Sequence, residues 1–266
     1  MKKCCSLIIA TYNWPSALQK CLDSVLMQTI LPDELIIADD GSGAETKLLV
    51  EHYKKLFPRP LLHIWQPDNG YQLAAIRNKA FAAAAGEYII QIDGDLLLHK
   101  NFLEDHLLYR RKGTFIGGSR AMLDEQSSRE ILVSNQLDEI TFLNKHVSKR
   151  YNALRLPVLT RLNYCIQRSK QNIHYVLGCN MAFWKEDLQK VNGYNEAFRG
   201  WGKEDNDLAV RLVNAGVELR FLKFGAIVYH LHHKSTERAT LKENESLFLE
   251  SIARKRTFVN AGMNRY

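Results

Sequence analysis

The chain has 266 residues, of which 46% are hydrophobic and 24% are charged, as in folded globular proteins, which excludes a disordered chain. No apolar run reaches the ~18 residues needed to span a bilayer, and the short run after the two lysines near the start lacks the length and cleavage site of a signal peptide. The five cysteines have no metal-finger spacing, so reduced thiols in a cytoplasmic protein are expected, and the net charge of +7 predicts an anionic partner.

The first part of the chain alternates short apolar runs with segments whose apolar residues recur at helical spacing. Strands are predicted over 6–10, 35–38, 61–65 and 88–92, and helices over 15–28, 45–57 and 73–85. This alternation is typical of an α/β protein with a Rossmann-like, mostly parallel central sheet that has helices on both faces.

The second part is less regular. A helix over 101–112 and a single strand over 114–122 are predicted first, whereas the polar, basic stretch 123–172 receives no assignment. A strand-like run over 174–184 follows, then helices over 185–191 and 207–215, strands over 218–222 and 226–229, and an amphipathic helical tail from residue 234.

The basic charge is concentrated in one stretch. Between Glu139 and Glu186 there is no Asp or Glu, and the basic residues there are Lys145, Lys149, Arg150, Arg155, Arg161, Arg168, Lys170 and Lys185. A solvated surface is one interpretation. The alternative is peripheral docking on the inner face of an anionic membrane, which the interleaved apolar residues favour.

The stretch EYIIQIDGDLLL, residues 87–98, is predicted to be a buried strand that ends in two carboxylates, Asp93 and Asp95. Asp and Gly are poor strand formers, so the carboxylates should lie at the carboxyl edge of the sheet, where ligands of open α/β folds bind. Such a pair suits Mg²⁺ or Mn²⁺ beside substrate phosphates. The alternative is an ordinary strand-to-helix turn.

Two later clusters are also candidates for chemistry. Residues 200–207, GWGKEDND, place three carboxylates next to Trp201, either as caps of the following helix or as a proton acceptor beside a sugar-stacking indole. His230, His232 and His233 follow a strand. If the strand continues, alternation places His230 and His232 on one face and His233 on the other, but the sequence leaves open which histidine binds a metal.

Four segments together resemble a known family. They are residues 6–29 (SLIIATYNWP and onward), 34–42 (ELIIADDGS), 76–95 (IRNKAF to QIDGD) and 176–212 (VLGCNMAFW to GWGKEDNDLAVRL). In this order they resemble the inverting, nucleotide-sugar-dependent glycosyltransferases of family 2, and the last segment is similar to the C-terminal module of β-1,4-galactosyltransferases and chondroitin-polymerase-type enzymes.

The resemblance implies an A-type glycosyltransferase fold with a small C-terminal helical extension. It implies one catalytic domain over 1–233, with a nucleotide-sugar half (1–122), a basic variable insert (123–172) and an acceptor half (173–233), followed by a tail over 234–266.

The resemblance also implies roles for individual residues. The donor site would comprise Thr11, Tyr12, Asn13, Asp39, Asp40, Arg77, Asp93, Trp201 and Gly202, with Asp40 reading the uracil and Arg77 near the base and diphosphate. Asp93, Asp95 and His230 would hold Mn²⁺ or Mg²⁺. Asp205 would be the catalytic base and Glu204 would bind the acceptor. Lys203 and Asn206 depart from the usual galactosyltransferase pattern.

The predicted reaction is inverting transfer of a hexose or N-acetylhexosamine from a UDP-sugar to a saccharide or lipid-linked saccharide acceptor, in bacterial surface polysaccharide or lipopolysaccharide synthesis. Nucleic acid is not an expected partner. Two alternatives are a degenerate transferase that binds saccharide without turnover, and a sugar nucleotidyltransferase. The second is disfavoured, because residues 11–13 (TYN) stand where that class has a glycine-rich, Arg-containing loop.

Overall fold

The computed structural model describes residues 5–134, 147–148, 150–167, 173–233 and 240–266. The larger of its two sheets has seven strands in the order β10 (Glu218–Phe221), β6 (Thr114–Gly117), β9 (Asn180–Trp184), β4 (Tyr88–Asp93), β1 (Cys5–Thr11), β2 (Glu34–Asp39) and β3 (Leu61–Trp65). Neighbouring strands are parallel except where β9 pairs with β4 and β6. The predicted mostly parallel α/β sheet is therefore confirmed.

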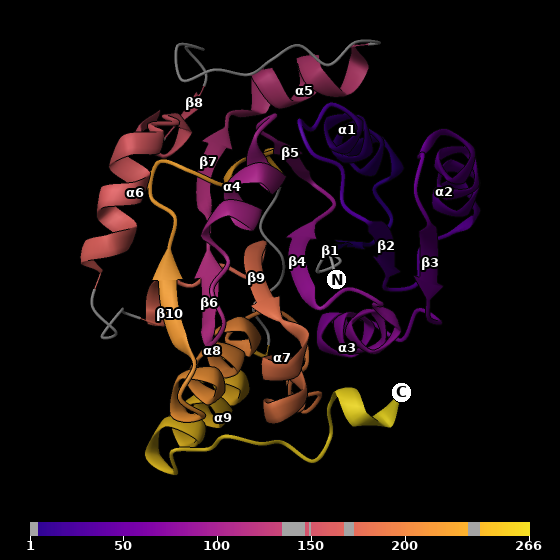
Figure 1. Ribbon diagram of the computed structural model, residues 1–266. Coiled ribbons are helices and arrows are strands. Elements are labelled where there is room, and N and C mark those ends of the chain that lie inside the picture. Colours follow the sequence, from indigo (N-terminus) through magenta and orange to yellow (C-terminus); the bar gives the residue numbers. More distant parts are fainter. Residues whose placement is uncertain (1–4, 135–146, 149, 168–172, 234–239) are drawn as a thin grey trace.

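Helices cover both faces of this sheet (Figure 1). One face carries α1 (Pro15–Leu26), α2 (Ala44–Leu56) and α4 (Phe102–Tyr109), and the other carries α3 (Leu73–Ala83), α7 (Lys185–Val191) and α8 (Glu204–Asn214). The strands supply apolar side chains to both faces: in β1, Leu7 and Ile9 join the first core and Ile8 the second. Burial on both faces explains why the central strands are continuously apolar.

A smaller second sheet has the order β5 (Leu96–Leu98), β11 (Ile227–His230), β7 (Ser119–Leu123) and β8 (Val147–Ser148). The prediction of one strand over 114–122 is wrong, because the chain leaves the large sheet after β6 and enters the small one as β7. Gly118 lies at this crossing. A Cβ there would come within 2.3 Å of the Asn180 amide, so only glycine fits where the chain changes sheets.

Other boundaries also differ from the predictions. The strand expected over 174–184 is only β9, preceded by a short 3₁₀ helix, η2 (Ile173–Tyr175). Helix α8 begins at Glu204, three residues earlier than expected. The unassigned stretch contains α5 (Glu125–Val133), η1 (Arg150–Ala153) and α6 (Pro157–Ile166). Part of the basic stretch, including Lys145, Lys149, Arg168 and Lys170, lies outside the described residues.

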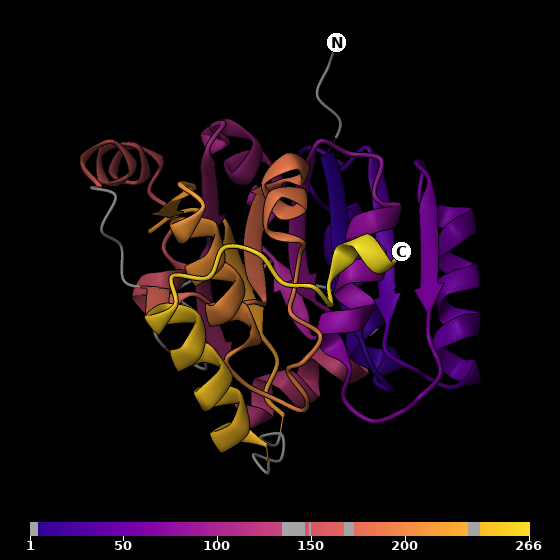
Figure 2. The same ribbon diagram turned by 90° about the horizontal axis from the view of Figure 1, so that it is seen from below.

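The C-terminal tail is helical only in part. Helix α9 (Leu241–Ala253) packs on α8 through Phe248, and the chain then runs back across the molecule to η3 (Met263–Arg265), as Figure 2 shows. Met263 joins the core beneath α3, so the tail is packed against the domain. The functional division of residues 1–233 stays a prediction. None of the helices in the described ranges is long and apolar enough to cross a bilayer.

Candidate active site

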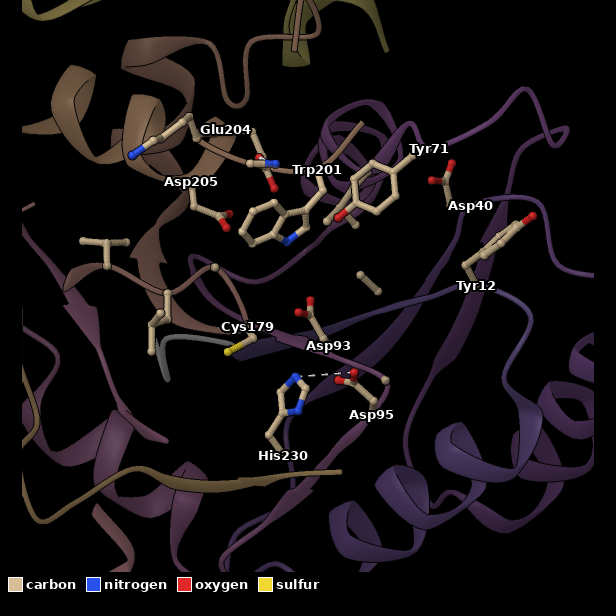
Figure 3. Close-up of a pocket in the computed structure, with 18 of the residues that line it drawn as sticks. Tyr12, Asp40, Tyr71, Asp93, Asp95, Cys179, Trp201, Glu204, Asp205 and His230 are labelled. Atoms are coloured by element: carbon tan, nitrogen blue, oxygen red, sulfur yellow. Dashed lines mark hydrogen bonds and ion pairs between the residues drawn. The ribbon is translucent and has the colours of Figure 1, made fainter. Parts of the chain in front are cut away.

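A cleft of about 590 Å³ opens where β1 and β4 end and the loop before α8 begins. Its volume is in the range of sites for small organic ligands. In Figure 3, Tyr12 and Asp40 lie at one end, Trp201, Glu204 and Asp205 lie at the other, and the carboxylates that follow β4 lie between them.

The small sheet brings Asp95 to two histidines. β5 starts one residue after Asp95 and pairs with β11, so the Leu231 N–H donates to the Asp95 carbonyl over 3.0 Å. The nearer Asp95 carboxylate oxygen, Oδ2, lies 3.5 Å from His230 Nε2 and 3.3 Å from His233 Nε2. One ligand atom from each of these three residues fits within a span of 4.8 Å, which is the arrangement of a metal site.

The protonation pattern of this cluster fits a cation. His230 Nδ1 donates to the Leu231 carbonyl over 2.8 Å, so in the neutral ring Nε2 carries a lone pair facing Asp95. Within the described residues the other carboxylate oxygen, Asp95 Oδ1, is buried without a hydrogen-bond partner. Although burial opposes it, the hydrogen bond from His233 and the positive charge that either histidine carries when protonated lower the pKa of Asp95. One carboxylate and two imidazoles suit a divalent ion such as Mn²⁺.

The structure places His233, which the sequence left open as a ligand, beside Asp95. The strand β11 ends at His230, so alternation no longer applies beyond it, and His233 turns back toward Asp95. His232 instead uses its backbone N–H to donate to Ser128 over 2.8 Å and is not part of the cluster.

Arg77 bridges two carboxylates from distant parts of the chain. Its guanidinium, 1% exposed, donates from Nη2 to Asp93 over 2.7 Å and from Nη1 to Asp205 over 2.9 Å. The predicted position of Arg77 near the base and diphosphate stays a prediction. In the structure the side chain lies behind the cleft wall and holds Asp93 and Asp205 in place. Burial raises the pKa of Asp93 even though Arg77 opposes this.

Asp205 is held by two hydrogen bonds to one of its carboxylate oxygens. Besides Arg77, the Tyr194 hydroxyl donates to Asp205 Oδ1 over 2.8 Å, and Gln91 Nε2 donates to that hydroxyl over 2.8 Å. A Cβ on Gly178 would come within 1.9 Å of the same Oδ1. Within the described residues Oδ2 has no hydrogen-bond donor, so one oxygen is held and the other is left for a ligand.

Glu204 lies beside this carboxylate in a different environment. Its side chain is buried and accepts the Gly202 N–H over 2.9 Å. Burial, together with the charge of Asp205, raises the pKa of Glu204 to about 8. Trp201, 40% exposed, precedes it in the loop and lines the cleft. Glu204 therefore holds its proton more tightly than a free glutamic acid does.

The residues after β1 and β2 form the other end of the cleft. Thr11, Tyr12 and Asp40 line it. Asp40 accepts the Gln72 N–H over 2.8 Å, and burial raises its pKa. Asp39 is buried against His63 at 2.9 Å and does not line the cleft.

Asn13 has a supporting position near the same end. It has a left-handed φ of 45° and accepts the Gly43 N–H over 2.9 Å. The two residues that depart from the galactosyltransferase pattern also have structural contacts. The Lys203 ammonium lies 5.4 Å from the Phe248 ring centre, and the Asn206 side chain donates to the Ile173 carbonyl over 2.9 Å.

Tyr194, Gln91 and Gly178 were not predicted. Each acts through another side chain, and a buried tyrosine or glutamine has no motif of its own. The available sequence signal was the position of Gln91 two residues before Asp93, which puts both side chains on the same face of β4.

The family model for glycosyl transferase family 2 matches residues 6–191. The chain belongs to glycosyl transferase family 2. A second model, the N-terminal domain of galactosyltransferase, matches residues 164–234. The predicted family and its galactosyltransferase-like C-terminal part are thus confirmed.

Curated relatives of this family 2 chain include a chondroitin synthase of Escherichia coli, 27% identical over 247 residues that cover 88% of this chain and 36% of that protein. The chondroitin synthase of Pasteurella multocida (strain Pm70) is 26% identical over 267 residues that cover 96% of this chain and 27% of that protein. The chain therefore spans about a third of the length of these relatives.

Solved structures show the fold. A mannosyltransferase of Pyrobaculum calidifontis, in complex with GDP-Man and Mn²⁺, has a TM-score of 0.64 at 17% identity over 96% of this chain and 65% of that chain. Residues 1–349 of S. aureus TarS, in complex with UDP, give 0.63 at 18% identity over 95% and 68%. The family 2 chain has the A-type glycosyltransferase fold.

Proposed function

We propose that this chain transfers a hexose or N-acetylhexosamine from a UDP-sugar to a saccharide hydroxyl with inversion at the anomeric carbon. The observation that carries the proposal is the placement of Asp205. Its carboxylate is held by Arg77 and Tyr194 on one side of the cleft, across from the Asp95–His230 pair (Figure 3). Inversion needs a proton acceptor opposite the leaving group, and this arrangement supports Asp205 as the acceptor, with the diphosphate leaving beside Asp95 and His230.

A divalent cation fits the described residues. Asp95, His230 and His233 would hold it, since Asp95 Oδ1 is buried without a partner and His230 Nε2 has a free lone pair. When bound, Mn²⁺ or Mg²⁺ supplies positive charge that stabilises a departing diphosphate. The additional metal contact of Asp93 stays a prediction, as does its alternative contact with the ribose.

The donor is proposed to place its uracil near Asp40 and Tyr12, at the opposite end of the cleft from Asp205. Asp40 is fixed by the Gln72 N–H and by Gln66, which leaves Asp40 able to recognise an imide edge. The complex of S. aureus TarS with UDP supports this class of donor.

The acceptor end is proposed to use the difference between the two carboxyls. Asp205 Oδ2 takes the proton from the attacking hydroxyl, whereas Glu204, still protonated at pH 7, donates a hydrogen bond to the acceptor. Trp201 offers an indole face for stacking on a sugar ring and, with Gly202, would cover donor and acceptor and limit hydrolysis.

We place this activity in surface polysaccharide or lipopolysaccharide synthesis, on the cytoplasmic side of a membrane. The chondroitin synthases and the hyaluronan synthase among the curated relatives support a polysaccharide product. The acceptor is proposed to be a saccharide, either free or lipid-linked.

The test is release of UDP from a panel of UDP-sugars in the presence of saccharide acceptors, comparing wild type with Asp205→Asn. We expect turnover to fall on the order of 10²–10⁴-fold, with UDP binding retained in calorimetry. Glu186→Gln, an exposed carboxylate on α7, is the matched control and should behave as wild type. Turnover of Asp205→Asn within a factor of a few would reject the assignment. Release of pyrophosphate would indicate a nucleotidyltransferase. Saccharide binding without UDP release would indicate a degenerate glycosyltransferase that binds saccharide without turnover.

A further inference from the structure

Helix α6 is amphipathic, but its polar side faces the protein and its apolar side faces outward. The side chains that face the protein are mostly polar and spaced for one side of a helix. The Thr160 hydroxyl donates to the Phe224 carbonyl over 2.9 Å, the Tyr164 hydroxyl donates to the Tyr109 carbonyl over 2.9 Å, and Gln167 Nε2 donates to the Phe221 carbonyl over 2.6 Å. Thr160 is the buried residue of this helix.

The side of α6 that faces away from the protein is apolar. Val158, Leu159, Leu162 and Ile166 are 72%, 45%, 56% and 73% exposed. Residues 158, 162 and 166 succeed one another at four-residue intervals, so they form one stripe along the helix. A surface helix of a soluble protein normally turns this stripe toward the core and its polar residues toward water. Figures 1 and 2 show α6 at the periphery of the molecule.

The charge around this stripe is positive. Residues 157–166 contain no carboxylate, Arg161 is exposed within the helix, and the surrounding stretch 140–185 lacks Asp and Glu. Arg155, two residues before the helix, is paired with the buried carboxylate of Asp105 at 2.8 Å, so the exposed charge of the helix is that of Arg161. An apolar stripe beside an exposed arginine, on a helix without a carboxylate, fits a helix that lies in the interface of an anionic bilayer.

We propose that the outward face of α6, formed by Val158, Leu159, Leu162 and Ile166, docks on an anionic lipid bilayer. The apolar stripe enters the boundary between headgroups and acyl chains, and Arg161 contacts lipid phosphates. The inward hydrogen bonds of Thr160, Tyr164 and Gln167 keep the helix fixed to the domain while its other face is in lipid. The chain would then work on acceptors presented at a membrane surface.

The experiment is co-sedimentation of the purified chain with vesicles of phosphatidylcholine, alone or with about 30% phosphatidylglycerol. Wild type should bind the anionic vesicles, and should bind less when salt rises from about 0.1 to about 1 M, which shortens the Debye length from about 10 to about 3 Å. The double variant Val158→Glu, Leu162→Glu should lose at least about tenfold in partitioning, since each apolar side chain contributes about that much when buried. Arg161→Gln should weaken binding to anionic vesicles but not to neutral vesicles.

The control is Leu48→Glu with Leu56→Glu, two exposed leucines on α2 that receive the same change of charge. This control should bind vesicles as wild type does. Equal loss in both double variants, equal binding of wild type to neutral and anionic vesicles, or no binding to either would overturn the proposal. So would a dimer in solution that Val158→Glu, Leu162→Glu dissociates, because the stripe would then be a protein interface.

UDP release with a soluble acceptor separates this proposal from the proposed function. The α6 double variant should keep wild-type turnover there, which also shows that it is folded. If the α6 variant misfolds, Arg161→Gln still tests the docking face, because this substitution changes only an exposed side chain.

Discussion

Replacing Gly178 by alanine tests whether the position of Asp205 limits the reaction. The change adds a single methyl group in the wall of the cleft. That carbon would come within 1.9 Å of Asp205 Oδ1 and 2.0 Å of its Cγ, whereas real contacts of this kind are above 3 Å. Aspartate has too short a side chain to yield at its tip, so the carboxylate must rotate away or the loop that carries Gly178 must shift.

Rotation breaks the two hydrogen bonds that Asp205 accepts from Arg77 and Tyr194, at 2.9 and 2.8 Å. Hydrogen bonds to a charged group each contribute about 1.5–3 kcal/mol. Losing both would therefore remove about 3–6 kcal/mol of the interactions that hold Asp205 in position. Since about 1.4 kcal/mol is a factor of ten in rate, kcat should fall on the order of 10²–10⁴-fold. KM for the UDP-sugar should change little, because the uracil end of the cleft is untouched.

The assay is steady-state UDP release across donor concentrations, with the thermal midpoint recorded for each variant. Gly43→Ala is the matched control, because the nearest atom to its new Cβ is 3.9 Å away and its φ of −75° suits alanine. If Gly178→Ala kept kcat within a factor of a few, the carboxylate would not need its present position, and the case for Asp205 as base would fail.

Three further predictions concern groups around the same cleft. Mn²⁺ should raise the thermal midpoint of wild type and of His232→Ala, but not of Asp95→Asn, since a ligand at about 100 times its Kd adds about 2.7 kcal/mol. The pKa of Glu204 in the folded protein is raised to about 8, so this residue lowers the free energy of unfolding as pH rises from about 4.3 to about 8. In urea unfolding, the free energy of unfolding of Glu204→Gln relative to wild type should therefore increase by on the order of 2–4 kcal/mol between pH 5.5 and 8.5. Arg77→Met should destabilise the fold by about 3–5 kcal/mol in urea, because two partly buried carboxylates lose their counter-charge.

Each of these has an outcome that contradicts it. A Mn²⁺ response that survives in Asp95→Asn would place the cation elsewhere. A pH profile of Glu204→Gln parallel to that of wild type would mean that Glu204 is ionised in the folded protein. An Arg77→Met variant as stable as wild type would mean that Asp93 and Asp205 are solvated enough to remain charged without a partner.

Local patterns carried most of what the sequence could predict. The run before Asp93 is apolar because β4 is buried on both faces, and the Asp and Gly residues that end it are poor strand formers. Apolar patterns of the same kind predict the first three strands, and apolar residues at helical spacing predict the helices that follow them. Local sequence patterns therefore predict that Asp93, Asp95 and Asp40 lie at one edge of a sheet.

Features that depend on contacts between distant parts of the chain could not be predicted from the sequence. The segment 114–122 has the length of one strand, and nothing local indicates that Gly118 faces Asn180 and divides the segment between two sheets. Helix α6 is short and rich in β-branched and polar residues, which are weak helix formers, so its pattern gave no assignment. Tyr194 acts only through a contact with Asp205, which the fold creates.

The return of the chain at residues 261–265 links its far end to the reacting groups. Glu196 donates its N–H to the Ala261 carbonyl and pairs through its carboxylate with Arg265 at 2.6 Å, and Met263 donates its N–H to the Asn192 carbonyl. These contacts clamp the turn that presents Tyr194 to Asp205. A substitution within residues 261–265 would therefore shift Asp205 from outside the cleft, although none of these residues lines it.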